Sequence, residues 1–79
     1  MTLVEFIRHH GGNNGVGGIE SLVRLSDVLE FASEEVLVEM GEFFADRGVD
    51  FGNELSNWSL CNTVLYIIRG DGKVHWGRS

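Results

Sequence analysis

The chain has 79 residues, of which 12 are acidic and 6 are Lys or Arg, for a formal net charge of −6. Its 43% hydrophobic content excludes wholesale disorder, and its length predicts one small domain over residues 1–79. One cysteine, Cys61, excludes an intrachain disulfide and is expected to be a small buried side chain. The chain opens with no basic-then-apolar leader and its longest apolar run is Val64–Ile68, so we expect a cytoplasmic protein without membrane contact.

The first predicted element is a short helix from Leu3 to about His9. Thr2 and Glu5 match a capping box, which pairs the side chain of each residue with the backbone N–H of the other. We interpret Gly11 as a left-handed cap at the end of this helix. A strand is the alternative, because side chains of residues 4–8 also alternate.

A glycine-rich segment, Gly11–Gly18, follows and holds five glycines in eight residues. It has the composition of a phosphate cradle, but no Lys follows it and Glu20 stands where a dinucleotide fingerprint needs its third glycine. We interpret it as a flexible connector able to order on binding. The next residues, Ile19–Leu25, alternate as in a half-buried strand, with a helix as the alternative.

The best helix signal of the chain runs from Glu34 to about Arg47, with Ser33 at its N-cap and Gly48 at its end. Before it, Ser26-Asp27 is predicted to cap a short turn through Phe31. Residues that share one arc of the main helix are expected to face the core: Val36, Leu37, Met40, Phe43 and Phe44.

The C-terminal half is predicted to form a hairpin after an irregular stretch. Val49–Asn62 reads as irregular, with Phe51 and Trp58 in the core. The hairpin strands are Thr63–Arg69 and Lys73–Gly77.

The hairpin turn, Gly70–Gly72, sets the expected register. A three-residue loop there places Ile68 opposite Val74 and Tyr66 opposite Trp76. The predicted apolar face is Val64, Tyr66, Ile68, Val74 and Trp76, and the opposite face is Leu65, Ile67, Arg69, Lys73 and His75. The predicted fold class is therefore α+β: a small antiparallel sheet, made of the C-terminal hairpin plus one strand, packs against one main amphipathic acidic helix, with a short N-terminal helix.

Charge is distributed unevenly along the chain. Ten acidic residues lie between Glu20 and Glu54 with only two arginines among them, which gives this block a net charge of −8. Residues 55–79 carry three cations and one acid, for a net charge of +2. A negatively charged surface patch attracts cationic partners and repels nucleic acid.

Four carboxylates of the main helix line up at spacings of four, three and four: Glu35, Glu39, Glu42 and Asp46. Like charges four residues apart destabilise a helix by about 0.2–0.5 kcal/mol per pair, and no Lys or Arg lies between these acids. Neighbouring acids rise by about 4.5–6 Å along the axis, a scale comparable to spacings along a nucleic-acid strand. We interpret the four as a partner-binding surface for a basic groove that normally holds a phosphate backbone; an ordinary solvated face is the alternative.

The residues of this acidic region also resemble a known pattern. The runs Leu25-Ser26-Asp27-Val28-Leu29-Glu30 and Ser33-Glu34-Glu35-Val36-Leu37-Val38-Glu39-Met40, closed by Asp46-Arg47-Gly48, are similar to an acidic helical pattern of small phage-encoded proteins. The format of a short acidic chain without a catalytic motif resembles many anti-CRISPR proteins, a group defined by function and lacking a common motif. This resemblance implies an inhibitor of a nucleic-acid-binding complex, such as a CRISPR effector, in the host cytoplasm.

Other candidate sites are weaker. His9 and His10 are adjacent and point to different helix faces, so we expect them to complement the helix dipole rather than bind a metal. Arg69, Lys73 and Arg78 near Trp76 give the hairpin the composition of a nucleic-acid-binding ribbon. The alternatives are that these cations protect the exposed strand edge or that they pair with the acidic helix.

No sequence pattern indicates catalysis. The serines lack a G-x-S-x-G context, and the paired carboxylates are predicted on an exposed face where pKa values stay ordinary. We therefore expect a non-enzymatic protein-binding module or inhibitor that uses its acidic surface on a basic protein surface, with no cofactor, no metal and no direct nucleic-acid contact. The alternative is a small regulatory nucleic-acid-binding module that uses the C-terminal hairpin.

Overall fold

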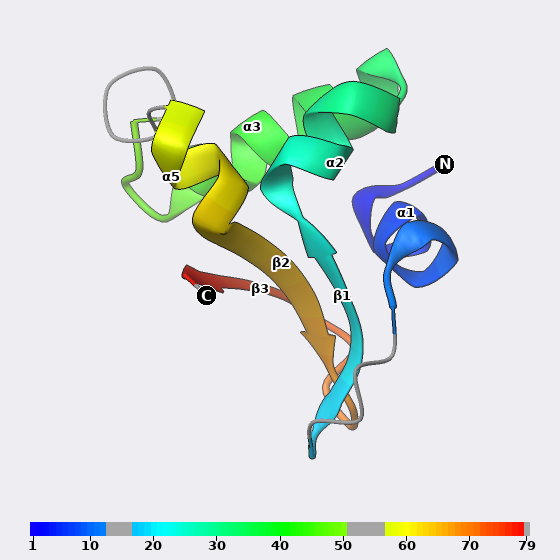
Figure 1. The fold of residues 1–79 in the computed structure, drawn as a ribbon. Helices are drawn as coiled ribbons and strands as arrows, with labels where there is room; N and C mark the ends of the chain where they lie inside the picture. Colours follow the sequence, from blue (N-terminus) through cyan, green and yellow to red (C-terminus); the bar gives the residue numbers. More distant parts are fainter. Residues whose placement is uncertain (13–16, 51–56, 79) are drawn as a thin grey trace.

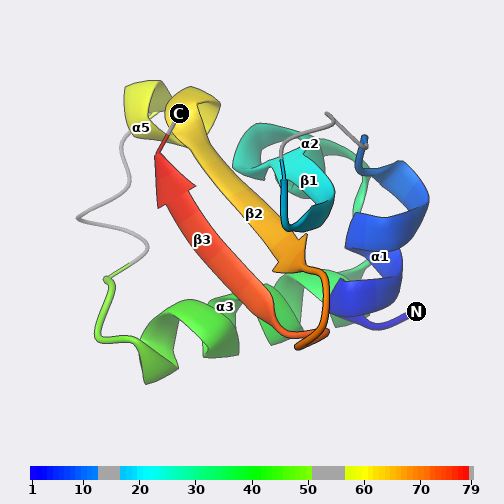
Figure 2. The same ribbon diagram turned by 90° about the horizontal axis from the view of Figure 1, so that it is seen from below.

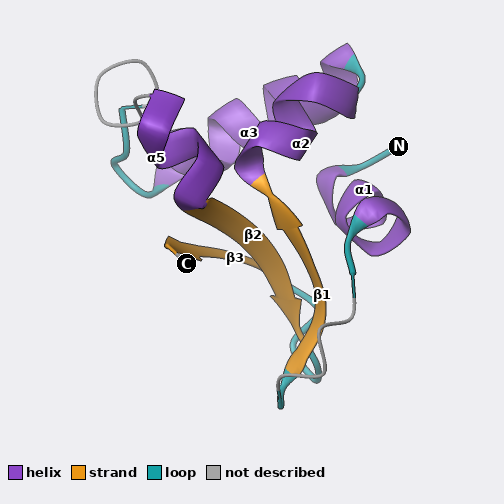
Figure 3. Cartoon of the chain, in the orientation of Figure 1, coloured by secondary structure: helices purple, strands orange, loops and turns teal. Residues whose placement is uncertain are grey.

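The computed structural model describes residues 1–12, 17–50 and 57–78, the side chains of residues 57–59 excepted. Its elements are, in chain order, α1 (Leu3–His10), β1 (Ile19–Arg24), α2 (Leu25–Phe31), α3 (Glu34–Asp46), α5 (Asn57–Asn62), β2 (Thr63–Ile68) and β3 (Val74–Arg78). The strands form one antiparallel sheet in the order β1-β2-β3 (Figure 1), and Figure 3 separates them from the helices by colour. The predicted α+β class, with a small antiparallel sheet and one main helix, is confirmed.

The helices lie at one end of the sheet and along two of its sides. Figure 1 shows α2 and α5 at the end of the sheet where β1 stops and β2 begins, and α1 beside β1. From below, α1 and α3 lie along two sides of the strands (Figure 2). The side chains that these elements bury together form one core: Leu3, Phe6, Ile7, Val23, Leu25, Val28, Val36, Met40, Phe44, Leu65 and Ile67.

The facing predicted for α3 is confirmed. Val36, Met40 and Phe44 are buried, and Leu37 and Phe43 pack partly buried against the same core. The apolar residues recur every three to four positions, so one side of the helix is turned to the core along its whole length. Across that contact, the ring of Phe44 meets the ring of Trp76 edge to face, with centroids 5.4 Å apart. Burying this stripe holds α3 on the domain.

The capping box of α1 is confirmed, and the role predicted for Gly11 is wrong. Thr2 Oγ1 accepts a hydrogen bond from Glu5 N at 3.1 Å, and Glu5 Oε1 accepts one from Thr2 N at 2.9 Å. Gly11 has extended backbone, with φ −74° and ψ 145°, so it is not a left-handed cap. A Cβ at this position would lie 2.3 Å from the carbonyl oxygen of Ile7 and 2.9 Å from that of Leu22. Glycine is required here because the carbonyl oxygen of Ile7 in the last turn of α1 and the backbone of Leu22 in β1 both lie close to this position.

Two helix starts differ in detail from the prediction. The turn predicted from Ser26-Asp27 is the helix α2, which begins at Leu25 directly after β1, with Arg24 at its N-cap and no capping side chain. Ser33 occupies the predicted N-cap of α3, but its side chain makes no capping hydrogen bond. The end of α3 follows the prediction, since Gly48 has φ +72° and donates its N–H to Ala45 O at 3.0 Å.

The hairpin forms, but its register differs from the prediction by one residue. Ile67 pairs with Val74, Tyr66 with His75 and Leu65 with Trp76. A slip of one residue moves every side chain of one strand to the other face relative to its partner. The core face therefore combines Leu65 and Ile67 of β2, predicted on the opposite face, with Val74 and Trp76 of β3, predicted on the apolar face.

The hairpin loop explains the different register. Residues 69–73 form a loop longer than the predicted Gly70–Gly72 turn, and both of these glycines have positive φ, 99° and 65°. Gly72 N donates to Ile68 O at 3.3 Å, and Asp71 Oδ1 accepts from Lys73 N at 2.8 Å. These contacts close the loop so that Val74 pairs with Ile67. A three-residue turn would have placed Val74 opposite Ile68.

The region before β2 is more regular than predicted. Asn57–Asn62 is the helix α5, so the irregular assignment is wrong for these residues, whereas Phe51, the side chain of Trp58 and residues 13–16 of the glycine-rich segment lie outside the described residues. Cys61 is exposed rather than buried. In its place Leu60 packs against the core, because adjacent residues of a helix point in different directions.

Candidate functional site

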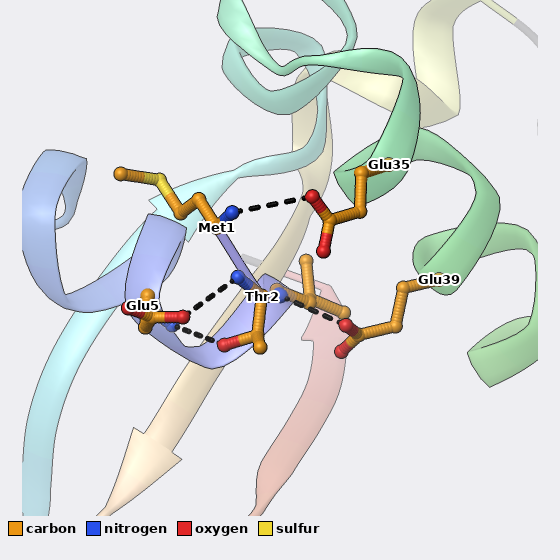
Figure 4. A network of polar contacts seen from close by, with 6 residues as sticks. Met1, Thr2, Glu5, Glu35 and Glu39 are labelled. Carbon is orange, nitrogen blue, oxygen red and sulfur yellow. Dashed lines mark hydrogen bonds and ion pairs between the residues drawn. The ribbon is translucent and has the colours of Figure 1, made fainter.

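Two of the four predicted partner-binding carboxylates contact the start of the chain. The N-terminal amine lies 3.3 Å from Glu35 Oε2, and Leu3 N donates a hydrogen bond to Glu39 Oε1 at 3.2 Å. Figure 4 shows both carboxylates of α3 directed at the start of α1. The first N–H groups of a helix have no intrahelical partner and attract negative charge, so Glu39 stabilises the position of α1 against α3.

The other two predicted residues, Glu42 and Asp46, are exposed and have no hydrogen bond or ion pair among the described residues. The neighbouring cation does not neutralise them. Arg47 places its guanidinium 3.7 Å above the ring of Phe43 and donates from Nη1 to Phe43 O at 3.1 Å. The C-terminal half of α3 therefore presents uncompensated negative charge.

Two further carboxylates belong with Glu42 and Asp46. Glu30, near the end of α2, and Glu34, in the first turn of α3, are exposed and likewise have no polar partner within the part of the chain that the structure describes. Glu34, Glu42 and Asp46 fall within about 120° of arc at about 100° per residue. We define the outer acidic surface as Glu30, Glu34, Glu42 and Asp46. Glu34 is not among the four residues predicted from the sequence, and its exposure in the structure places it on this surface.

Apolar side chains are exposed among these acids. Phe31, the last residue of α2, is 62% exposed, and Val38, one turn after Glu34, is 55% exposed. Gly41 and Ala45, on the same side of α3, are exposed as well. The described residues form no pocket, so this surface has no concave site for a small molecule. The arrangement suits contact with another macromolecule.

Among the described residues, the hairpin cations do not pair with the carboxylates of α3. In the described ranges, the ion pairs are those of Met1 with Glu35 and of Arg8 with Glu20 at 2.6 Å, and His75 Nε2 lies within hydrogen-bond distance of Asp71 Oδ2 at 2.9 Å. Lys73 is exposed and has no acidic side chain as a partner there. The pairing of hairpin and acidic helix that we considered from the sequence is therefore not present among these residues.

Aromatic groups of the hairpin face two directions. Trp76 lies on the core side, as predicted, and contacts Phe44. On the other side of the sheet, Tyr66 and His75 pair across the strands with stacked rings, 5.6 Å between centroids and 20° between planes. Trp76 thus packs against the core, whereas Tyr66 and His75 form an aromatic surface on the other face of the sheet.

The carboxylate of Asp71 is expected to stabilise the hairpin loop at neutral pH and to lose this effect in acid. Its pKa is lowered from the ordinary 3.8, first by the hydrogen bond from the Lys73 N–H and then by that from His75. A carboxyl whose pKa is lowered by folding adds stability above its unfolded pKa, and that stability is lost as pH falls through the folded pKa. Asp71→Asn should therefore lower the Tm at about pH 6, with a deficit that shrinks towards about pH 3.

Thermal melts across that pH range measure the effect. Asp46→Asn is the matched control, because this carboxylate has no partner in the described residues and should show no such pH-dependent deficit. An equal deficit for Asp71→Asn at every pH would mean that the charge contributes nothing to the loop.

His9 and His10 contact each other and α1 itself. The His10 ring stacks on Phe6 with centroids 4.3 Å apart, and the His9 ring meets His10 edge to face at 4.8 Å. Across the described ranges, no group of three His, Cys, Asp or Glu side chains is placed to hold a metal ion. Within the same ranges no helix is both long and apolar enough to cross a bilayer.

These observations define a small α+β protein whose candidate site is a helix surface rather than a cleft. No protein family, characterised protein or solved structure matches the chain with significant similarity.

Proposed function

We propose that the chain is a non-enzymatic protein-binding module that acts as an inhibitor by covering a basic surface of its partner. The observation that carries this proposal is the outer acidic surface: four exposed carboxylates without a polar partner in the described residues, on a chain of net charge −6. Glu42 and Asp46, four residues apart without a cation between them, cost helix stability, and Asp46 lies at the end of α3 where the helix dipole disfavours anions. Their field attracts a cationic partner.

The class of target follows from the same charge. A cluster of carboxylates on a helix presents negative charge as a phosphate backbone does, so it competes for a basic nucleic-acid-binding site. The resemblance in format to anti-CRISPR proteins supports the same proposal, with a phage origin, a CRISPR effector as one candidate target and the host cytoplasm as the place of action. Glu35 and Glu39 have a supporting part, since both contact the start of the chain.

A second candidate function is a small regulatory nucleic-acid-binding module that uses the hairpin. The stacked Tyr66 and His75 rings on the sheet face opposite the core favour it, because such rings can stack with bases. The position of Trp76 in the core and the net negative charge of the chain count against it. We place this function second.

Reversal of the outer acidic surface tests the proposal. The variant carries four changes: Glu30→Lys, Glu34→Lys, Glu42→Lys and Asp46→Lys. It removes no core contact, and it keeps Glu39 of α3, whose carboxylate accepts the hydrogen bond from Leu3 at the start of α1. Because steering by a charged surface changes association rates by about 10 to 10³-fold, we expect a loss of that size against a partner captured from host lysate. Stopped-flow or surface-binding kinetics at low and moderate salt measure it, with circular dichroism to verify folding.

The matched control reverses the hairpin cations instead, in the variant Arg69→Glu, Lys73→Glu and Arg78→Glu. This variant should bind the protein partner at the wild-type rate or faster. Binding that is lost in the hairpin variant and kept in the acidic variant would favour the nucleic-acid-binding function. A folded acidic variant with the wild-type rate and salt dependence would remove the support for the inhibitor.

A further inference from the structure

The outer side of α3 carries an apolar strip bordered by acids. Val38, Gly41 and Ala45 are exposed and fall within about 60° of helix arc; Glu34 lies on the same arc at its N-terminal end, and Glu42 borders it on one side. A Cβ at Gly41 would have no atom within 4 Å, so packing inside this chain gives no reason for glycine there. Glycine in a helix interior is less stable than alanine, but it lets another backbone come close.

Phe31, at the end of α2, is a large exposed apolar side chain close in sequence to the start of α3. Only Ala32 and Ser33 separate it from the first turn of α3, and its side chain is 62% exposed next to Glu30 in the sequence. Large aromatic side chains are the commonest anchors of protein interfaces. Because the described residues contain no pocket, a partner has to lie along this surface rather than enter it.

We propose that Phe31 and the outer side of α3 bind a basic amphipathic helix of the partner, an inference that rests on the proposed function and names its partner more closely. Two packed helices lie about 8–10 Å apart, and small residues such as Gly41 permit the shorter distance. Charge complementarity specifies the residues that flank the apolar stripe of the partner helix. The carboxylates of Glu42 and Asp46 along one side of the strip, and of Glu34 at its N-terminal end, need Lys or Arg beside the partner's apolar stripe, as flanking charges do in paired helices.

The length of α3 sets the length of the contact. Its 13 residues span about 20 Å, which matches three to four turns of a partner helix. A nucleic-acid strand is excluded as occupant of this face by the sign of the charge, and an acidic or neutral helix would leave the carboxylates without partners.

Synthetic peptides test the occupant directly. The probe is a helical peptide of about 18 residues with Leu at every third or fourth position and Lys and Arg beside that stripe; the control has the same composition in scrambled order. We expect the probe to bind at least about tenfold more tightly than the control in fluorescence anisotropy, and to shift the amide NMR signals of Val38, Gly41 and Ala45. Equal binding of the two peptides, or shifts confined to other elements, would overturn the proposal.

Variants of the protein separate this inference from the proposed function. Gly41→Ala should bind the probe nearly as well as wild type, whereas Gly41→Gln and Phe31→Ser should each weaken binding about tenfold while Gly41→Gln unfolds at an equal or higher temperature. His9→Ser changes an exposed residue of α1 and is the control, so it should not change binding of the probe. If reversal of the outer acidic surface slows the natural partner but Gly41→Gln and Phe31→Ser bind it normally, the proposed function stands and the helix inference fails. If the reversal has no effect either, both fail.

Discussion

Met40→Asp is expected to leave the chain unfolded at room temperature. Met40 is 2% exposed at the middle of α3 and belongs to the core that joins this helix to the sheet. An aspartate there must either bury an unpaired charge or take up a proton, and the effective penalty of a buried charge is several kcal/mol. Since small domains have a total stability of only about 5–15 kcal/mol, one such change is enough. Near-UV and far-UV circular dichroism measure the loss of structure.

Val38→Asp is the matched control for this prediction. It adds the same charge to the same helix two residues earlier, but at a side chain that is 55% exposed, so cooperative unfolding should persist. Phe43→Asp should have an intermediate effect, because Phe43 is only partly buried and Arg47 lies above its ring, where it can pair with a carboxylate. Cooperative melting of Met40→Asp near the wild-type Tm would show that this face of α3 does not hold the core.

The elements that the sequence predicted correctly are those with local signals. The capping box of Thr2 and Glu5 starts α1 within four residues of sequence, and the periodicity of Val36 and Met40 gives both the existence and the facing of α3. Such patterns depend only on neighbours along the chain, so a single sequence contains them. α5 was missed because it is six residues long and shows no comparable cap or periodic stripe.

The errors concern distances between elements. The hairpin register depends on how residues 69–73 close, including the hydrogen bond from Lys73 N to Asp71, and no alternation pattern fixes that closure. Apolar residues fill both faces of β2, so the pattern fitted either register. The need for glycine at position 11 comes partly from Ile7, four residues earlier, and partly from Leu22, on a different element.

The candidate site was predicted in part for the same reason. The helix wheel put Glu35, Glu39, Glu42 and Asp46 on one side, which is correct as geometry, but the wheel does not show what packs beside it. The backbone N–H of Leu3, 36 residues from Glu39, donates a hydrogen bond to that carboxylate. Among the described residues, the acids without a polar partner include Glu34. The negative charge of the region was therefore readable from the sequence, whereas its division into structural and outer acids required the position of α1.

Gly11→Ala is expected to destabilise the fold more than any other exchange of a glycine for alanine at the described positions without positive φ. The added Cβ would lie 2.3 Å from Ile7 O and 2.9 Å from Leu22 O, both of them backbone atoms that cannot rotate away. Relief requires the backbone at residue 11 to move away from both the end of α1 and β1, which strains the paired hydrogen bonds between Gly12 and Leu22, 3.0 and 3.1 Å long. Overpacking of this kind costs about 1–3 kcal/mol and sometimes more, so chemical denaturation should show a clear fall in the unfolding free energy.

Gly12→Ala supplies the control one residue further along the chain. A Cβ at Gly12 has no atom within 4 Å, so its stability should stay within about 0.5 kcal/mol of wild type. Gly11→Asn then separates the two explanations for the glycine. A left-handed cap would accept asparagine, which adopts positive φ readily, but a close approach of two backbones rejects any Cβ. We therefore expect Gly11→Asn to be at least as unstable as Gly11→Ala, and wild-type stability of either variant would contradict the contact between α1 and β1 on which the position of the whole N-terminal helix depends.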